Sequence, residues 1–179
     1  MAGPVLTIEL SKPVPDRELS ELRAFLTRVS FSLSERRPGD FSASIHAERL
    51  GVTDTGGHDG RRPFLITVMG PGVGDEEIFE AEHADEDLLP LIGFTPTHAI
   101  GVSAMCNRPV DHVATAALTA AIMDLVGGVA MAELREDQFS VVPGLPGVLA
   151  TSFDRWPTAY GSATFLRSWA ELPGFRLVK

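Results

Sequence analysis

The stretch from His98 to Leu134, HAIGVSAMCNRPVDHVATAALTAAIMDLVGGVAMAEL, predicts a strand, a long apolar helix and a second strand joined by short turns. Residues 99–106 are small or apolar and uncharged, which is typical of a strand covered on both faces. Residues 111–126 show helical periodicity with apolar side chains around most of the circumference, so we expect this helix to be covered on most sides. Gly127 and Gly128 end it, because glycine accepts the left-handed cap conformation. If the two strands run parallel in one sheet, their crossover should be right-handed.

A narrow polar stripe on this helix, formed by His112, Thr115 and Thr119, predicts a hydrogen-bonding surface or a semi-buried role for His112. Cys106, the only cysteine, lies in the most apolar strand, so we expect a buried and inert thiol. Asp111 and His112 follow Cys106 closely and suggest a Cys–His pair. Adjacent helical residues point in different directions, however, and Cys106 belongs to the preceding strand, which argues against that pair.

The rest of the chain alternates strand and helix patterns. Residues 4–10 predict a half-buried strand, with Leu6, Ile8 and Leu10 on one face and Thr7 and Glu9 on the other. The remaining elements that we expect are strands at 41–49 and 63–69, helices at 16–29 and from about 162 to 172, and short strands at 31–37, 139–142, 147–152 and 175–178.

These patterns predict one α+β domain over residues 1–179. Its sheet should be mixed but mostly antiparallel, with about three to four helices packed on it, including the central strand-helix-strand unit.

The chain is acidic, with a formal net charge of −9 and a pI near 4.9. This charge repels phosphate backbones, which argues against direct nucleic-acid binding, and it favours basic protein partners. The alternative is that many cytoplasmic proteins are simply acidic. No apolar run approaches the ~20 residues of a membrane span, and the N-terminus lacks a basic segment ahead of an apolar run. We therefore expect a cytoplasmic protein with neither a signal peptide nor membrane association.

The densest charge lies in residues 75–87, a run of thirteen residues without lysine or arginine. Such a run is usually a solvated face or loop, but its one-sided negative field can also steer a basic protein surface onto it. Two aromatic residues in a predicted loop are further candidate contacts, since amphipathic aromatics are enriched at interfaces. The predicted partner-binding residues are Asp75, Glu76, Glu77, Glu80, Glu82, Asp85, Glu86, Asp87, Trp156 and Tyr160.

No catalytic motif is present, and we expect no catalytic, cofactor or metal site. Asp54, His58 and Asp59 share a turn-rich loop, but they match no established ligand spacing. The glycine-rich loop at residues 70–74 lacks the lysine of a phosphate-binding loop and is followed by acids, so a tight turn before an acid-capped helix is the better interpretation. An enzyme or ligand-binding domain whose pocket forms only on folding, lined by His98, His112 or Cys106, stays an alternative.

Several motifs resemble a family of uncharacterised bacterial proteins similar to immunity proteins of polymorphic toxin systems. They are GFTPTHAIGVSAMCNRPVDH, the helix break LVGG, Leu145-Pro146-Gly147, and the tail FLRSWAELPGFRLVK, and together they lie within residues 88–179. In such families a helix ending in Leu/Phe-x-x-Trp precedes a Pro-x-Phe turn and a short basic terminal strand. The resemblance implies a cytoplasmic, non-enzymatic binding protein that blocks a cognate toxin, often a basic nuclease, by occlusion. A third hypothesis, a structural subunit of a larger complex, would require a large exposed apolar patch.

Overall fold

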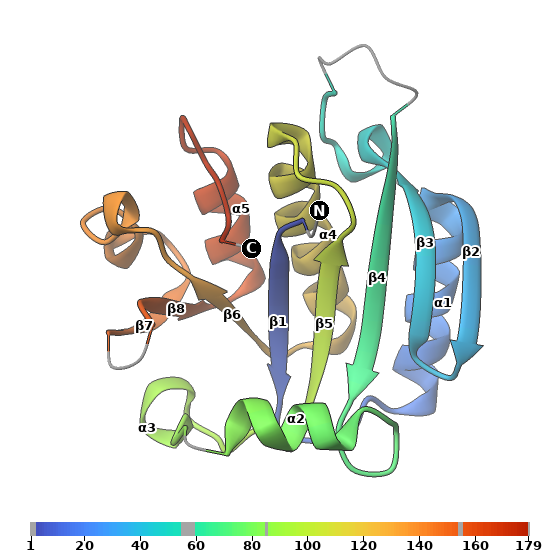
Figure 1. The fold of residues 1–179 in the computed structure, drawn as a ribbon, viewed down its shortest axis with the longest axis horizontal. Helices are drawn as coiled ribbons and strands as arrows, with labels where there is room; N and C mark the ends of the chain where they lie inside the picture. Colours follow the sequence, from blue (N-terminus) through green and yellow to red (C-terminus); the bar gives the residue numbers. More distant parts are fainter. Residues whose placement is uncertain (1–2, 55–59, 85, 154–155, 179) are drawn as a thin grey trace.

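The N-terminal strand β1 (Val5–Leu10) lies in the middle of an eight-stranded sheet (Figure 1). The structure is a computed structural model, and it describes residues 3–54, 60–84, 86–153 and 156–178. Over these residues the strand order is β2-β3-β4-β5-β1-β6-β8-β7, and every neighbouring pair is antiparallel. The other strands are β2 (Ser30–Arg37), β3 (Asp40–His46), β4 (Arg61–Met69), β5 (His98–Ala104), β6 (Val129–Glu133), β7 (Val148–Ser152) and β8 (Thr158–Gly161).

The central strand-helix-strand unit is present, but its two strands are not neighbours. Strands β5 and β6 both pair antiparallel with β1, which lies between them. They therefore run parallel to one another without a shared ladder of hydrogen bonds. The prediction of an α+β domain is confirmed. The prediction of a mixed sheet is wrong for the described residues: β5 and β6 are the parallel strands of the central unit, but β1 lies between them, so they do not form a parallel pair.

Helices lie on both faces of the sheet. The described residues form five α-helices, more than the three to four expected, because two short helices between β4 and β5 carry little periodicity. Figure 1 shows α2 in front of the sheet at its lower edge, by the ends of β1 and β5, while the longer helices lie behind the sheet. The helices are α1 (Asp16–Val29), α2 (Glu76–His83), α3 (Leu89–Ile92), α4 (Pro109–Val126) and α5 (Ala163–Ala170), with 3₁₀ turns η1 (Ala47–Leu50), η2 (Glu136–Gln138) and η3 (Val142–Gly144).

Helix α4 is the centre of the main core. It packs against α1, α5 and strands β1, β5 and β6, with Leu118 and Ile122 fully buried. Among the described residues it is the one helix long and apolar enough to cross a membrane, and burial in this core accounts for that composition. Its polar stripe faces inward: His112, Thr115 and Thr119 are fully buried, so a surface role for His112 is excluded.

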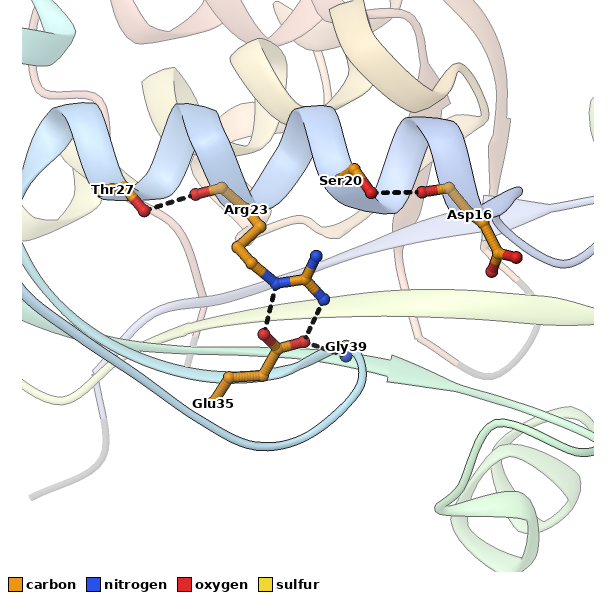
Figure 2. Close-up of polar contacts among 6 residues, drawn as sticks. All are labelled: Asp16, Ser20, Arg23, Thr27, Glu35 and Gly39. Carbon is orange, nitrogen blue, oxygen red and sulfur yellow. Dashed lines mark hydrogen bonds and ion pairs between the residues drawn. The ribbon is translucent and has the colours of Figure 1, made fainter.

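A polar clamp holds α1 against the β2–β3 hairpin (Figure 2). The guanidinium of Arg23 donates two hydrogen bonds to the Glu35 carboxylate, of 2.5 and 2.8 Å, and the backbone N–H of Gly39 donates a third of 3.0 Å. The hydrogen bonds from Arg23 lower the pKa of Glu35. Because the pair is bidentate, it sets the angle of α1 on the hairpin as well as contributing attraction.

The C-terminal third differs most from the sequence-based prediction. Strand β8 was not predicted, residues 139–142 form turns in place of a strand, and residues 175–178 are irregular. The tail is held in another way, because the backbone N–H of Leu177 donates 3.1 Å to Nδ1 of the buried His112. Trp169 anchors the core of this third, since it is 1% exposed and stacked on Phe165.

The turn from α4 to β6 generates a stability prediction. Gly128 has φ of +91°, and a Cβ there would lie 2.6 Å from Cγ2 of Ile8 and 2.7 Å from the carbonyl oxygen of Glu9. We expect Gly128→Ala to lower the free energy of unfolding by about 3 kcal/mol, through backbone strain and overpacking against β1. The control is Gly51→Ala, which has φ of +74° but no atom near its Cβ, and should cost about 1 kcal/mol. Equal losses in urea titrations of the two variants would contradict this account of the turn.

Candidate functional site

Helix α2 is pinned to the sheet at its N-terminal end by Arg37. The Arg37 guanidinium donates to the carbonyl oxygen of Val73 at 2.6 Å and pairs with the carboxylate of Asp75. Asp75 adopts a left-handed conformation, with φ of 47°, which aspartate tolerates better than most residues. Because the carboxylate of Asp75 is paired with Arg37, Asp75 anchors α2 more than it offers a contact to a partner.

The C-terminal end of α2 is held by a buried ion pair with the central strand. Nε2 of His83 lies 2.9 Å from Oε2 of Glu9, and its Nδ1 lies 2.7 Å from the carbonyl oxygen of Phe79. Both ring nitrogens thus face acceptors, so the hydrogen-bond network assigns His83 the doubly protonated, positively charged form. Burial acts to lower the pKa of His83, but the hydrogen bond and charge of Glu9, with the Phe79 carbonyl, outweigh it and the pKa is raised.

Glu9 is the least expected member of this group, because a carboxylate in the middle strand of a sheet is fully buried. One oxygen binds His83, while the other, Oε1, has no hydrogen-bond partner among the described residues. A buried oxygen without a donor is uncommon in native proteins. Burial, reinforced by the charges of Glu9 and Glu86, also raises the pKa of neighbouring Glu82, although the His83 charge opposes this.

An acidic cavity of about 390 Å³ opens beside this ion pair, on the face of the sheet that α2 covers. Its floor comes from β1 and β6, one wall from the end of α2, and the rim from Trp156 and the C-terminal tail. A volume of this size falls within the range of about 300–1,000 Å³ of ligand pockets. We define the acidic cavity by its lining residues: Val5, Thr7, Ala81, Glu82, His83, Glu86, Met131, Glu133, Trp156 and Val178.

The net charge of the whole protein originates in the segment that carries this site. Residues 1–69 contain nine Lys or Arg and nine Asp or Glu, and residues 135–179 contain five and four. Residues 70–134 contain one and eleven, so this segment accounts for the excess of acids. Eight of these eleven acids lie within residues 75–87, so the excess is concentrated in the sequence around α2, which a generally acidic composition does not explain.

Most of the predicted acidic residues lie where a partner can reach them. The exposed side chains on α2 and the segment after it are Glu76, Glu77, Glu80, Glu82, Glu86 and Asp87. Two of these, Glu82 and Glu86, also line the acidic cavity. Asp85 lies outside the described residues.

The two predicted aromatic contacts have different fates. Trp156 is 61% exposed and lines the acidic cavity, next to the acidic segment in space though far from it in sequence. The placement of Tyr160 in a loop is wrong, because Tyr160 belongs to β8 and is 3% exposed, packed with Leu88 and Ile92. Its ring therefore joins a small core beneath α3 and offers no surface to a partner.

Sequence reasoning missed Glu9 and His83, the residues that hold the site together. The predicted half-buried strand placed Thr7 and Glu9 together on its solvent-exposed face. In the structure Thr7 is 8% exposed and Glu9 is fully buried. Residues far apart in the chain, at positions 9 and 83, meet only because α2 folds over β1. A single glutamate in an otherwise uncharged strand was the available signal, and it does not identify its partner.

The other candidate residues fill structural roles. Asp54 and Asp111 both pair with the buried guanidinium of Arg62, which links β4 to the start of α4. His58 and Asp59, which share the turn-rich loop with Asp54, lie outside the described residues. The described residues hold no group of three or more possible metal ligands. His98 is buried, with its Nε2 donating 3.1 Å to the carbonyl oxygen of Pro71.

Cys106, expected to be buried, is half-buried and follows the end of β5. His112, as noted above, accepts from the C-terminal tail. None of Cys106, His98 and His112 lines the acidic cavity.

The chain belongs to DUF6368, a family of unknown function, whose family model matches residues 2–179. No curated protein and no solved structure matches the chain significantly. The function must therefore be inferred from the chemistry of the site.

The Glu9–His83 pair generates a stability prediction. His83→Ala leaves a buried carboxylate without its partner, so we expect a loss of about 3 kcal/mol in the free energy of unfolding near pH 6. Glu9→Gln, which keeps an acceptor for His83 and removes the buried charge, should cost less. Urea unfolding followed by far-UV circular dichroism measures both variants.

The same pair also predicts a pH dependence. Because folding raises the pKa of His83, its contribution is complete below the unfolded pKa of about 6.5 and declines as pH rises through the folded value. The stability difference between wild type and His83→Ala should therefore shrink from pH 6 to pH 9. A difference that stays constant or grows over this range would show that His83 is not held in the charged form.

Proposed function

We propose that this protein is a non-enzymatic binding protein that recognises a basic protein through the face carrying α2, and that it acts in the cytoplasm as an immunity-type inhibitor. Inhibition would be steric: this protein, once bound, would cover the active surface of a cognate toxin. The single observation that carries the proposal is the concentration of the net charge on the segment that forms α2 and the acidic cavity.

The rigidity of the acidic face supports this proposal. Arg37 holds one end of α2 and Glu9 holds the other, so the exposed acids between them are presented in a defined arrangement. Residues 63–107 contain no lysine or arginine, so no cation from within that segment neutralises the field. A pre-organised surface of one sign raises association rates with oppositely charged proteins and disfavours phosphate backbones.

The alternative of a small enzyme draws on one observation, the His–Glu couple beside a cavity. In an acid–base role, His83 would have to exchange a proton with a substrate in the cavity. Both of its nitrogens already bind acceptors within the protein, and Glu9 has no exposed surface. The couple therefore serves better as an anchor for α2 than as a proton-transfer pair, which favours the binding hypothesis.

Charge reversal on α2 tests the proposal. The variant Glu76→Lys/Glu77→Lys/Glu80→Lys changes three exposed acids that do not line the cavity. Against a panel of purified basic nuclease domains of polymorphic toxins, we expect wild type to inhibit at least one member. The triple variant should associate with it about tenfold more slowly at low salt, because the steering field is lost.

The matched control is Glu48→Lys/Glu136→Lys/Glu171→Lys, which makes the same change in net charge at exposed positions elsewhere on the fold. Its association rate, measured by stopped-flow fluorescence at low and high salt, should stay close to that of wild type. Equal slowing by both triple variants, or no inhibition of any panel member by wild type, would contradict recognition through α2.

A further inference from the structure

We infer that the acidic cavity is a pocket for one arginine side chain presented by the partner protein. The inference rests on the proposed function, since it assumes a basic partner, and adds the chemical group that is recognised and the residues that recognise it. The guanidinium group, flat face and long apolar stem of arginine match the three kinds of surface in the cavity.

The walls of the cavity supply negative charge. Glu82 comes from the last turn of α2 and Glu86 from the segment that follows it. Glu133 comes from the end of β6, which pairs with β1 on the side away from β5. All three residues are exposed, and the charge of His83 acts on Glu82. Among the residues that the structure describes, no lysine or arginine lines the cavity, and His83 is paired with Glu9. The described lining residues therefore include three carboxylates and one cationic side chain, an excess of negative charge that suits a cationic group.

The rim supplies an aromatic face. Trp156 is 61% exposed, an unusual position for an indole that packs in no core. A guanidinium stacks on an indole through cation–π attraction and keeps its N–H groups free to bind carboxylates in the plane. Val5, Met131 and Val178 add apolar surface along which the methylene stem of an arginine can lie.

The buried carboxylate of Glu9 gives an independent indication of a missing donor. Glu9 projects from the same face of β1 as Thr7, which lines the floor of the cavity, and its Oε2 contacts His83, which lines the wall. Its second oxygen, Oε1, has no donor among the described residues although the side chain is fully buried. A guanidinium offers five N–H groups. One bound between Thr7 and His83 would satisfy this oxygen where the side chains that cover Glu9 move aside, while its other N–H groups bind the exposed glutamates.

A metal ion fits the site less well. The described residues hold no group of three or more histidine, cysteine or acidic side chains arranged to bind one. The spread of Glu82, Glu86 and Glu133 over two walls, together with an indole and aliphatic side chains, suits a planar organic cation. Lysine, a compact ammonium without a planar face, would use the carboxylates but gain less from Trp156.

The test uses three capped pentapeptides of sequence Gly-Ala-X-Ala-Gly, where X is arginine, lysine or citrulline, the neutral isostere of arginine. Binding to the full chain is measured by calorimetry and by the NMR shift of the Trp156 indole N–H. We expect the arginine peptide to bind, the lysine peptide to bind more weakly, and the citrulline peptide to bind at least about tenfold more weakly, since it cannot form charge-assisted hydrogen bonds.

Variants of exposed residues locate the site without disturbing the core. Trp156→Ala should weaken binding of the arginine peptide about fivefold, as loss of an exposed cation–π contact would. Glu133→Gln should weaken it by a similar factor, whereas the control Glu171→Gln, an exposed acid outside the cavity, should leave it unchanged. Circular dichroism confirms that each variant is folded.

Each outcome decides the inference. Equal binding of the arginine and citrulline peptides, or unchanged binding in both Trp156→Ala and Glu133→Gln, overturns it. Tighter binding of free arginine than of the capped peptide also overturns it, because the cavity would then be a small-molecule site. If the peptide does not bind but charge reversal on α2 still slows association with a nuclease domain, the pocket is wrong and the proposed function stands. If the peptide binds at the cavity while no basic nuclease domain is inhibited, the pocket is upheld and the proposed function fails.

Discussion

The site depends on one buried interaction, the ion pair between Glu9 and His83. It joins the central strand of the sheet to the last turn of a helix that has little other attachment, since Phe79 is the single buried residue of α2. Burying two charges costs desolvation free energy, and the mutual attraction with the added hydrogen bond to the Phe79 carbonyl offsets that cost. A helix as short and as acidic as α2 would not be stable alone, so its position on the sheet depends on these contacts.

From that attachment follows the arrangement of charge. With Arg37 at one end and Glu9 at the other, α2 lies in front of the ends of the central strands (Figure 1), and its glutamates are exposed. The acidic cavity lies where the end of α2 meets β1 and β6, and Trp156 reaches it from the connection between β7 and β8. The opposite face of the sheet is filled by α1, α4 and α5. One face of the sheet therefore carries the main hydrophobic core, and the other carries the acidic cavity.

Prediction from sequence succeeded where a single element contains its own signal. The bounds of α1 agree with the predicted 16–29, and α4 with 111–126 apart from its first turn, because a helix 14 or 18 residues long shows its apolar periodicity several times over. The alternation in β1 identified a strand, and Gly127 and Gly128 identified the end of α4. The acidic run and Trp156 were singled out by composition alone, and the structure places Trp156 with Glu82 and Glu86 of that run around one cavity.

What the sequence determined by itself was the identity and extent of its longer elements and the strong acidity of one segment, since these depend on neighbouring residues in the chain. The tertiary structure alone decided that β1 separates β5 from β6, that Tyr160 is buried, and that Glu9 meets His83. The physical reason is that strand order and ion pairing are contacts between distant positions. Their free energy depends on burial and geometry that exist only after the sheet has assembled, so no local pattern encodes them.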